Sequence, residues 1–356
     1  MARASVYGLP ALALIIALAP ATALGQVEVS EPWTTMMLRK ATSISDRTPV
    51  ITNESVEEMA QAYAFDLGHR MTLDVLAELH PHLAREFHGQ LAEYNKRFSS
   101  SVRMIDESLL RFNKPWKDTR TELESALRSA IDRSALRDKA TARSFLEEAM
   151  RRGRGEIPER IKQALSTCNP TYLAQPGEEM IRGNKLRHRI PKGPKNPNLA
   201  ISLEFPISWQ IREGNHPHTV ATGTSESGRG LEAFTVQIRA QPEDFDTSNS
   251  SHDDLLALAD AVAPDSASTT HRSITSIGGA PCVIVELDST NERLGLVMHA
   301  KNVHFVVLRN GHVIHMSAAV AAEEHELTRL EDRLNAYRPL FGLIANSLVC
   351  PDREAR

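Results

Sequence analysis

Three histidines that flank a predicted helix corner, His80, His82 and His88, are the residues best suited to bind a metal ion. Imidazole nitrogen is a good ligand for copper or zinc. Pro81 lies between the first two histidines, and because proline favours the first position of a helix, their side chains are expected to diverge. Neither cysteine nor carboxylate recurs around them at ligand spacing. The pattern therefore favours no metal site.

Nucleophilic catalysis requires a serine or cysteine at a strand-to-helix turn together with a histidine that orients it. The chain has no Gly-x-Ser-x-Gly motif, and the residues beside its cysteines match no protease signature. No residue is predicted to be catalytic or to bind a cofactor, so the sequence favours a non-enzymatic role. The alternative left open is a metal carrier or enzyme that uses the His80/His82 corner or a cleft between domains.

A short predicted strand at residues 185–190 carries Lys185, Arg187 and Arg189 at alternate positions, so these basic side chains share one face. They form a candidate anion-binding strip for a phosphate, an acidic lipid or an acidic partner. The alternative is a solvated face that discourages strand pairing at a sheet edge, and the pattern favours this second interpretation.

The chain contains three cysteines, Cys168, Cys282 and Cys350. Cys282 lies in the run Pro-Cys-Val-Ile-Val, which is typical of a buried strand in which a thiol packs as a small apolar group. The other two stand beside Asn or Pro and are expected in surface turns, one at the end of each domain. In an oxidising compartment this predicts a disulfide between Cys168 and Cys350.

The N-terminus predicts export. Arg3 precedes an uncharged run rich in Leu, Ala and Ile, and small residues follow at positions 21–25, which is the pattern of a signal peptide spanning residues 1–25. Pro10 and Pro20 interrupt the run, which disfavours a retained membrane anchor. The mature chain is expected to be periplasmic or secreted, without a membrane span. Its charge, 40 basic minus 45 acidic residues once Arg3 is removed, excludes a general affinity for nucleic acid.

After a leader at residues 26–51, residues 52–167 are predicted to be entirely helical. The first helix has apolar residues at Val56, Met59, Tyr63, Leu67, Met71, Val75 and Leu79. A second apolar stripe runs from Leu83 to Phe112 in steps of three and four, which predicts one long helix. Further helices are expected at residues 116–131, 135–152 and 156–165, and together they predict a hairpin or bundle.

Residues 168–196 are rich in Pro and Gly and are predicted to be a linker. From Leu199 to Ile211 every odd position is apolar, which predicts a half-buried strand bent at Pro206. Strand patterns continue to position 320, with an Asn310-Gly311 hairpin signal and helices at residues 252–262 and 323–348. We therefore predict an α+β domain at residues 197–350 that folds alone, followed by a tail at residues 351–356.

Three short segments of this domain resemble the PsbP-like α/β/α sandwich family: Phe205–Trp209, Ile277–Ala280 and Phe341–Ser347. Their order matches the family's, and the resemblance covers a little under half of the chain. It implies an antiparallel sheet packed by helices, and it implies no activity, since a fold does not fix a function. The helical region lies outside the resemblance.

Taken together, the sequence predicts an exported two-domain protein of the cell envelope that binds a partner protein or supports an assembly. The identity of that partner does not follow from the sequence.

Overall fold

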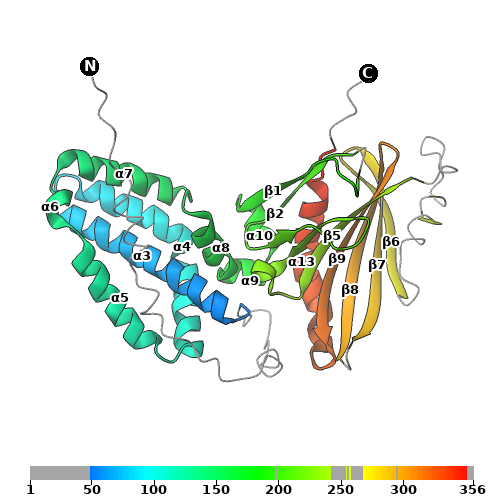
Figure 1. Cartoon of the computed structure of the whole chain (residues 1–356), viewed down its shortest axis with the longest axis horizontal. Helices are drawn as coiled ribbons and strands as arrows, with labels where there is room; N and C mark the ends of the chain where they lie inside the picture. Colours follow the sequence, from blue (N-terminus) through cyan, green and yellow to red (C-terminus); the bar gives the residue numbers. More distant parts are fainter. Residues whose placement is uncertain are drawn as a thin grey trace, which may run out of the picture. The chain divides into compact units, whose positions relative to one another are not determined.

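The computed structural model describes residues 49–196, 199–241, 254, 256, 257, 268–293 and 296–350. The predicted signal peptide, nearly all of the leader, the tail and most of the helix predicted at residues 252–262 lie outside these residues. The chain divides into two compact units, with the boundary between Pro170 and Thr171. The predicted combination of N-terminal helices and a C-terminal α+β domain is confirmed (Figure 1).

The helical unit contains α3 (Asn53–Leu79), α4 (Ala84–Phe112), α5 (Trp116–Ala130), α6 (Arg133–Leu136), α7 (Lys139–Gly153) and α8 (Glu159–Thr167). A reciprocal pair of hydrogen bonds starts α3: Thr52 N–H donates to Ser55 Oγ at 2.6 Å, and Ser55 N–H donates to Thr52 Oγ1 at 3.1 Å. Such a capping box satisfies amide groups that have no partner within the helix. The apolar face predicted for the second helix is buried along α4 at Phe87, Tyr94, Phe98, Ile105 and Leu109.

The buried face of α3 differs from the predicted one. Of the predicted stripe, Tyr63 and Leu67 are only half-buried, whereas Phe65, Asp66 and His69 are buried. The reason is that α3 contacts α4, α5 and α8, so it buries more than one narrow stripe. Two of the buried side chains just named, Asp66 and His69, are polar, and an apolar periodicity does not detect polar side chains.

The C-terminal unit begins with short elements and continues into a sheet. In chain order the elements are α9 (Pro170–Ala174), α10 (Gly177–Ile181), β1 (Lys185–Ile190), β2 (Ile201–Pro206), β3 (Gln210–Arg212), β4 (Thr219–Thr224), α11 (Ser225–Gly228), β5 (Glu232–Ala240), β6 (Ser268–Ile277), β7 (Ala280–Arg293), β8 (Leu296–Arg309), β9 (His312–Glu323), a 3-10 helix η2 (Glu324–Arg329) and α13 (Leu330–Asn346).

Seven strands form one antiparallel sheet in the order β3-β4-β5-β9-β8-β7-β6, while β1 pairs with β2 in a separate two-stranded sheet. The predicted Asn-Gly hairpin joins β8 to β9: Asn310 and Gly311 have φ values of 55° and 73°, as a two-residue turn of this kind requires. The predicted strand at Leu199–Ile211 is divided, because Pro206 ends β2 and the chain then enters β3 in the larger sheet.

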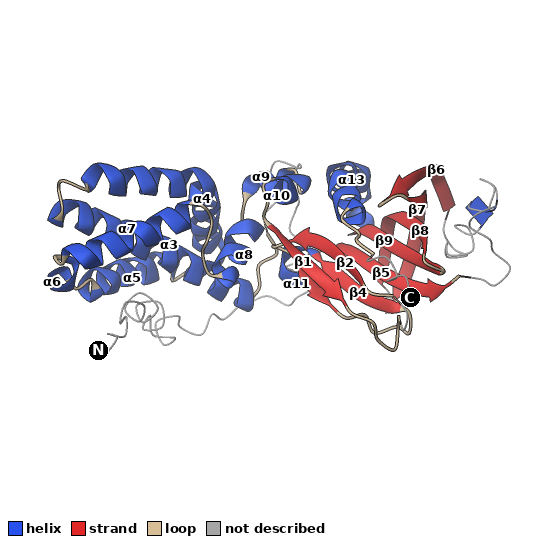
Figure 2. Ribbon diagram, turned by 90° about the horizontal axis from the view of Figure 1, so that it is seen from above, coloured by secondary structure: helices blue, strands red, loops and turns tan. Residues whose placement is uncertain are grey.

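The helix α13 packs against one face of the seven-stranded sheet, as Figure 2 shows. Phe341 of α13 is fully buried and lies 6.4 Å from the ring of Phe234 in β5. A smaller apolar cluster that includes Val283, Val306 and Val313 is buried on the other face. In the described part of the chain, no helix is long and apolar enough to cross a membrane.

The stretch predicted to be a linker, residues 168–196, instead forms α9, α10 and β1. Met180 and Ile190 are part of the C-terminal core, and the backbone N–H of Ser208 donates to Glu179 at 2.9 Å. The prolines and glycines are used where short elements begin and end, for example at Gly183, whose φ is 78°. This use explains why the composition of the stretch is that of a linker.

Candidate functional site

The three histidines that are candidate metal ligands do not converge: His80 is buried, and the other two are exposed. The Nε2–H of His80 donates to the Leu136 carbonyl at 2.7 Å, and the ring is buried. The rings of His80 and His82 lie 5.9 Å apart and nearly perpendicular, while His82 and His88 are exposed. Among the residues that the structure describes, no three His, Cys, Asp or Glu side chains are grouped so as to hold a metal ion. The geometry therefore gives no support to the metal alternative.

The candidate anion-binding strip lies on β1, and one acidic residue neutralises part of it. Lys185 Nζ lies 2.6 Å and Arg187 Nη2 3.1 Å from carboxylate oxygens of Glu204, which is the register partner of Arg187 on β2. The two hydrogen bonds lower the pKa of Glu204. Arg189 is exposed opposite Ser202. Two of the three bases thus share one acid, and the strand keeps a positive face.

Exposed apolar side chains also lie on and around β1, although Leu186 alternates with the three bases and so points to the other face of the strand. Ile181, at the end of α10, is 65% exposed, and Leu186 in β1 is 43% exposed. Val349 is 48% exposed and is joined to Ser202 of β2 by two backbone hydrogen bonds of 2.9 Å. Within the described residues β1 is paired to β2 alone, so it forms an edge. We call β1 with Ile181 and Val349 the β1–β2 surface.

The helical unit contains a second polar group, which lies in its interior. On α3, Asp66 forms an ion pair of 2.9 Å with Arg70. His69, one position before Arg70, accepts a hydrogen bond at Nδ1 from Arg152 Nη1 of α7, at 3.2 Å. Arg152 Nε in turn lies 2.9 Å from Glu148. Tyr94 and Ser101 are buried on α4. We call Asp66, His69, Tyr94 and Ser101, together with Arg70, Glu148 and Arg152, the interior polar cluster.

Burial shifts the titration of this cluster strongly. It raises the pKa of Asp66 to about 6, although the positive charge of Arg70 opposes the shift. Burial, together with the charge of Arg152, lowers the pKa of His69 to about 3, so the imidazole is neutral. Burial and the Asp66 charge raise the pKa of Tyr94, whose ring lies 4.6 Å from that of His69. Perturbed pKa values of this size are typical of functional sites but also occur in buried structural groups.

A pair of histidines is buried on the sheet. His315 of β9 and His304 of β8 are joined by a hydrogen bond of 2.8 Å between His315 Nε2 and His304 Nδ1. Burial lowers the pKa of His304 to about 4 and that of His315 to about 3. Both rings are therefore neutral near pH 7, and the pair joins two neighbouring strands.

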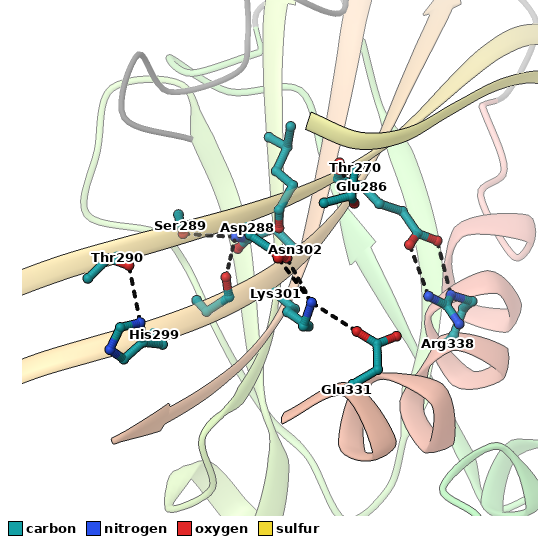
Figure 3. Close-up of polar contacts among 12 residues, drawn as sticks. Thr270, Glu286, Asp288, Ser289, Thr290, His299, Lys301, Asn302, Glu331 and Arg338 are labelled. Carbon is teal, nitrogen blue, oxygen red and sulfur yellow. Dashed lines mark hydrogen bonds and ion pairs between the residues drawn. The ribbon is translucent and has the colours of Figure 1, made fainter. Parts of the chain in front are cut away.

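Ion pairs fix α13 to the sheet, as Figure 3 shows. Lys301 of β8 contacts Asp288 at 3.0 Å and Glu331 of α13 at 2.9 Å. Arg338 of α13 donates two parallel hydrogen bonds to Glu286, at 3.0 and 2.9 Å. Two arginine–carboxylate bonds of this kind fix orientation as well as distance. These residues position the helix and need no ligand to explain their arrangement.

A more deeply buried carboxylate lies where β5 begins. Glu232 is 0% exposed and receives a hydrogen bond of 2.6 Å from Arg333 Nε of α13. Ser225 Oγ also donates to it. Gly230 is required here, because a Cβ atom at this position would overlap Ser225 Oγ. The turn before β5 is thus shaped around an ion pair that joins the sheet to α13.

The cysteines are only partly as predicted. Cys282 is fully buried in β7, and burial raises the pKa of its thiol to about 12. Cys168 and Cys350, expected in surface turns, are 2% and 7% exposed. The structure does not show a disulfide between them, and they belong to different units. The Cys168–Cys350 bond therefore stays a prediction.

No family model matches the chain, and no curated protein matches it. Solved structures do resemble its C-terminal part. A cyanobacterial PsbP (CyanoP) from Synechocystis has a TM-score of 0.31 and 17% identity, covering 47% of this chain and 92% of that one. LpqN of Mycobacterium tuberculosis, described as involved in cell envelope biogenesis, has a TM-score of 0.30 and 13% identity, with the same two coverages of 47% and 92%.

A protein of unknown function from Pseudomonas aeruginosa, described as a putative regulator, has a TM-score of 0.24 and 16% identity, and covers 47% of this chain and 97% of that one. The predicted resemblance of the C-terminal part to PsbP-like domains is confirmed to this extent. At these identities the likeness concerns the fold alone.

Proposed function

We propose that the chain is an exported, non-enzymatic binding or scaffold protein of the cell envelope, and that it binds a partner protein through the β1–β2 surface. Export rests on the N-terminal pattern of Arg3, an uncharged apolar run and small residues at the expected cleavage site. The partner's chemistry follows from the surface: an acidic segment that also carries apolar side chains.

The observation that carries this proposal is the combination of exposed apolar and basic side chains on one edge strand. Exposed apolar residues that cluster within a polar rim are typical of interaction sites. Here Ile181, Leu186 and Val349 are exposed on and around a strand that carries three bases, of which Lys185 and Arg187 share the carboxylate of Glu204. The excess positive charge favours an acidic partner and would speed its association at low salt.

A pull-down from envelope extract tests this proposal. The full mature chain serves as bait beside the double variant Arg187→Gln/Arg189→Gln, which lowers the positive charge of β1 and leaves the Lys185–Glu204 ion pair in place. The matched control is Arg103→Gln/Arg128→Gln, which removes two exposed charges from the helical unit.

We expect the wild-type chain and the control to recover the same protein at low salt. The β1 variant should recover several-fold less of it, because the recognition charges are lost. Equal recovery by all three baits would contradict the proposed surface.

A further inference from the structure

The helical unit encloses polar atoms for which its own side chains supply no partner. Within the described part of this unit, Asp66 Oδ1, His69 Nε2, Tyr94 OH and Ser101 Oγ are buried and make no hydrogen bond to protein. The four residues are 3%, 4%, 0% and 1% exposed, respectively. Folded proteins pair nearly all buried polar groups, either with other protein groups or with ordered water. A group of such atoms in one region therefore indicates a bound partner.

These atoms lie along the contact between α3 and α4. Asp66 and His69 are three residues apart on α3, and Tyr94 and Ser101 are seven apart on α4, so each pair lies on one face of its helix. The His69 and Tyr94 rings are 4.6 Å apart.

The charges around the cluster exclude an ion as the bound partner. Arg70 pairs with Asp66 at 2.9 Å, and Arg152 pairs with Glu148 at 2.9 Å, a carboxylate that the more exposed Arg151 also contacts, so each charge in the cluster has an opposite charge beside it. The two guanidinium groups would repel a metal cation, and the Asp66 carboxylate would repel an anion. An uncharged molecule is the remaining class.

The hydrogen-bonding roles of the four atoms define that molecule further. Because the Arg152 guanidinium can only donate, His69 Nδ1 accepts, and the neutral ring carries its proton on Nε2. His69 thus offers a donor, Asp66 Oδ1 offers an acceptor, and the hydroxyl groups of Tyr94 and Ser101 can do either. Water both donates and accepts, and it is the smallest molecule that meets this set.

We propose that the α3–α4 contact binds ordered water, with at least one molecule held by His69 Nε2, Asp66 Oδ1 and the Tyr94 hydroxyl. An internal water usually makes about three hydrogen bonds, which is what these three groups provide. With internal water bound, the buried polar atoms of the interior polar cluster would have hydrogen-bond partners and would not be a packing defect.

The test counts long-lived water molecules in the full mature chain by oxygen-17 magnetic relaxation dispersion. Tyr94→Phe removes only the hydroxyl, and we expect it to lower the count by one or more relative to wild type. Thr72→Val is the control: its hydroxyl, on α3, donates to the Gly68 carbonyl at 2.8 Å and so needs no water. The control should leave the count unchanged.

Equal counts for wild type and Tyr94→Phe would overturn the proposal, as would a high-resolution crystal structure in which another molecule or direct bonds satisfy these atoms. Should Tyr94→Phe fail to fold, magnetisation transfer from water to the Tyr94 and His69 ring protons in the wild-type chain decides the question. Magnetisation transfer from a long-lived water to the protons of both rings supports the proposed water site. If no such transfer is seen, the site is rejected.

Discussion

At the scale of single residues, two neighbours on α3 titrate in opposite senses. The folded-state pKa of His69, about 3, lies below its unfolded value, so its contribution to stability is present above pH 6.5 and is lost as the pH falls. The folded-state pKa of Asp66, about 6, lies above its unfolded value, so its charged form destabilises the fold above pH 6, and acidification relieves this. Between pH 7 and 4.5 the two effects nearly cancel.

Single substitutions should reveal each effect. We expect Asp66→Asn to make the helical unit less stable at pH 4.5 than at pH 7, and His69→Gln to make it more stable at pH 4.5, each by on the order of 2 kcal/mol. The charged groups around them are Arg70 on α3 and Glu148 and Arg152 on α7, and hydrogen bonds from Arg151 and Arg152 lower the pKa of Glu148.

The measurement is urea unfolding at each pH, read by pulsed hydrogen exchange of α3 and α4 at one fixed pulse pH. Parallel pH profiles for the two variants would contradict the assignment of these pKa shifts.

The buried carboxylate of Glu232 supplies a second prediction at this scale. Replacing Arg333 by Met should destabilise the C-terminal unit by about 3 to 5 kcal/mol, because it leaves a buried charge uncompensated. Arg133→Met is the control. It breaks an ion pair of 2.7 Å with Glu78 in which both side chains are more than half exposed, and such pairs contribute about 0 to 1 kcal/mol. Urea unfolding midpoints of the two variants measure the two losses of stability. Similar losses would show that the burial of an ion pair does not determine how much it stabilises the fold.

At the scale of elements, local sequence patterns predicted a helix that buries one apolar face and a hairpin turn that is set by its two central residues. The stripe from Leu83 to Phe112 corresponds to α4, and Asn310-Gly311 forms the β8–β9 turn. Periodicity could not show that Pro206 sends the chain into a different sheet, since that choice depends on pairing with distant strands. It also could not identify the interior polar cluster, because Asp66 and His69 have no apolar signal. The one indication in the sequence was the spacing of Asp66, His69 and Arg70, which places three polar side chains within about one turn of the same helix.

The short elements before β2 bear on the prediction that residues 197–350 fold alone. A fragment of residues 197–350 lacks β1, the partner strand of β2, and also lacks Met180 and Ile190 from the core. We expect it to be several kcal/mol less stable than a fragment of residues 171–350, since each lost core side chain removes about 2 kcal/mol or more. Circular dichroism during urea unfolding of both fragments measures this difference. Equal stability would restore the interpretation of residues 168–196 as a linker.

At the scale of the whole molecule, export is the prediction on which the choice of compartment depends. If residues 1–25 are a cleaved signal, the intact mass of protein from the envelope fraction should correspond to a chain that begins at Leu24 or Gln26. The control is the same protein made in the cytosol without residues 1–25. A full-length mass in the membrane fraction would show that the segment is retained as an anchor.

The binding claim is tested most directly by cross-linking at the β1–β2 surface. A photoreactive amino acid replaces Leu186 in the full chain, and a second version carries it at Leu110, an equally exposed apolar position on α4, 46% against 43% exposed. Both are expressed with the N-terminal segment and irradiated in intact cells. We predict one dominant protein cross-linked from position 186, absent from position 110, and reduced several-fold by Arg187→Gln/Arg189→Gln. The same cross-links from both positions, or no change on removal of the two charges, would contradict the account.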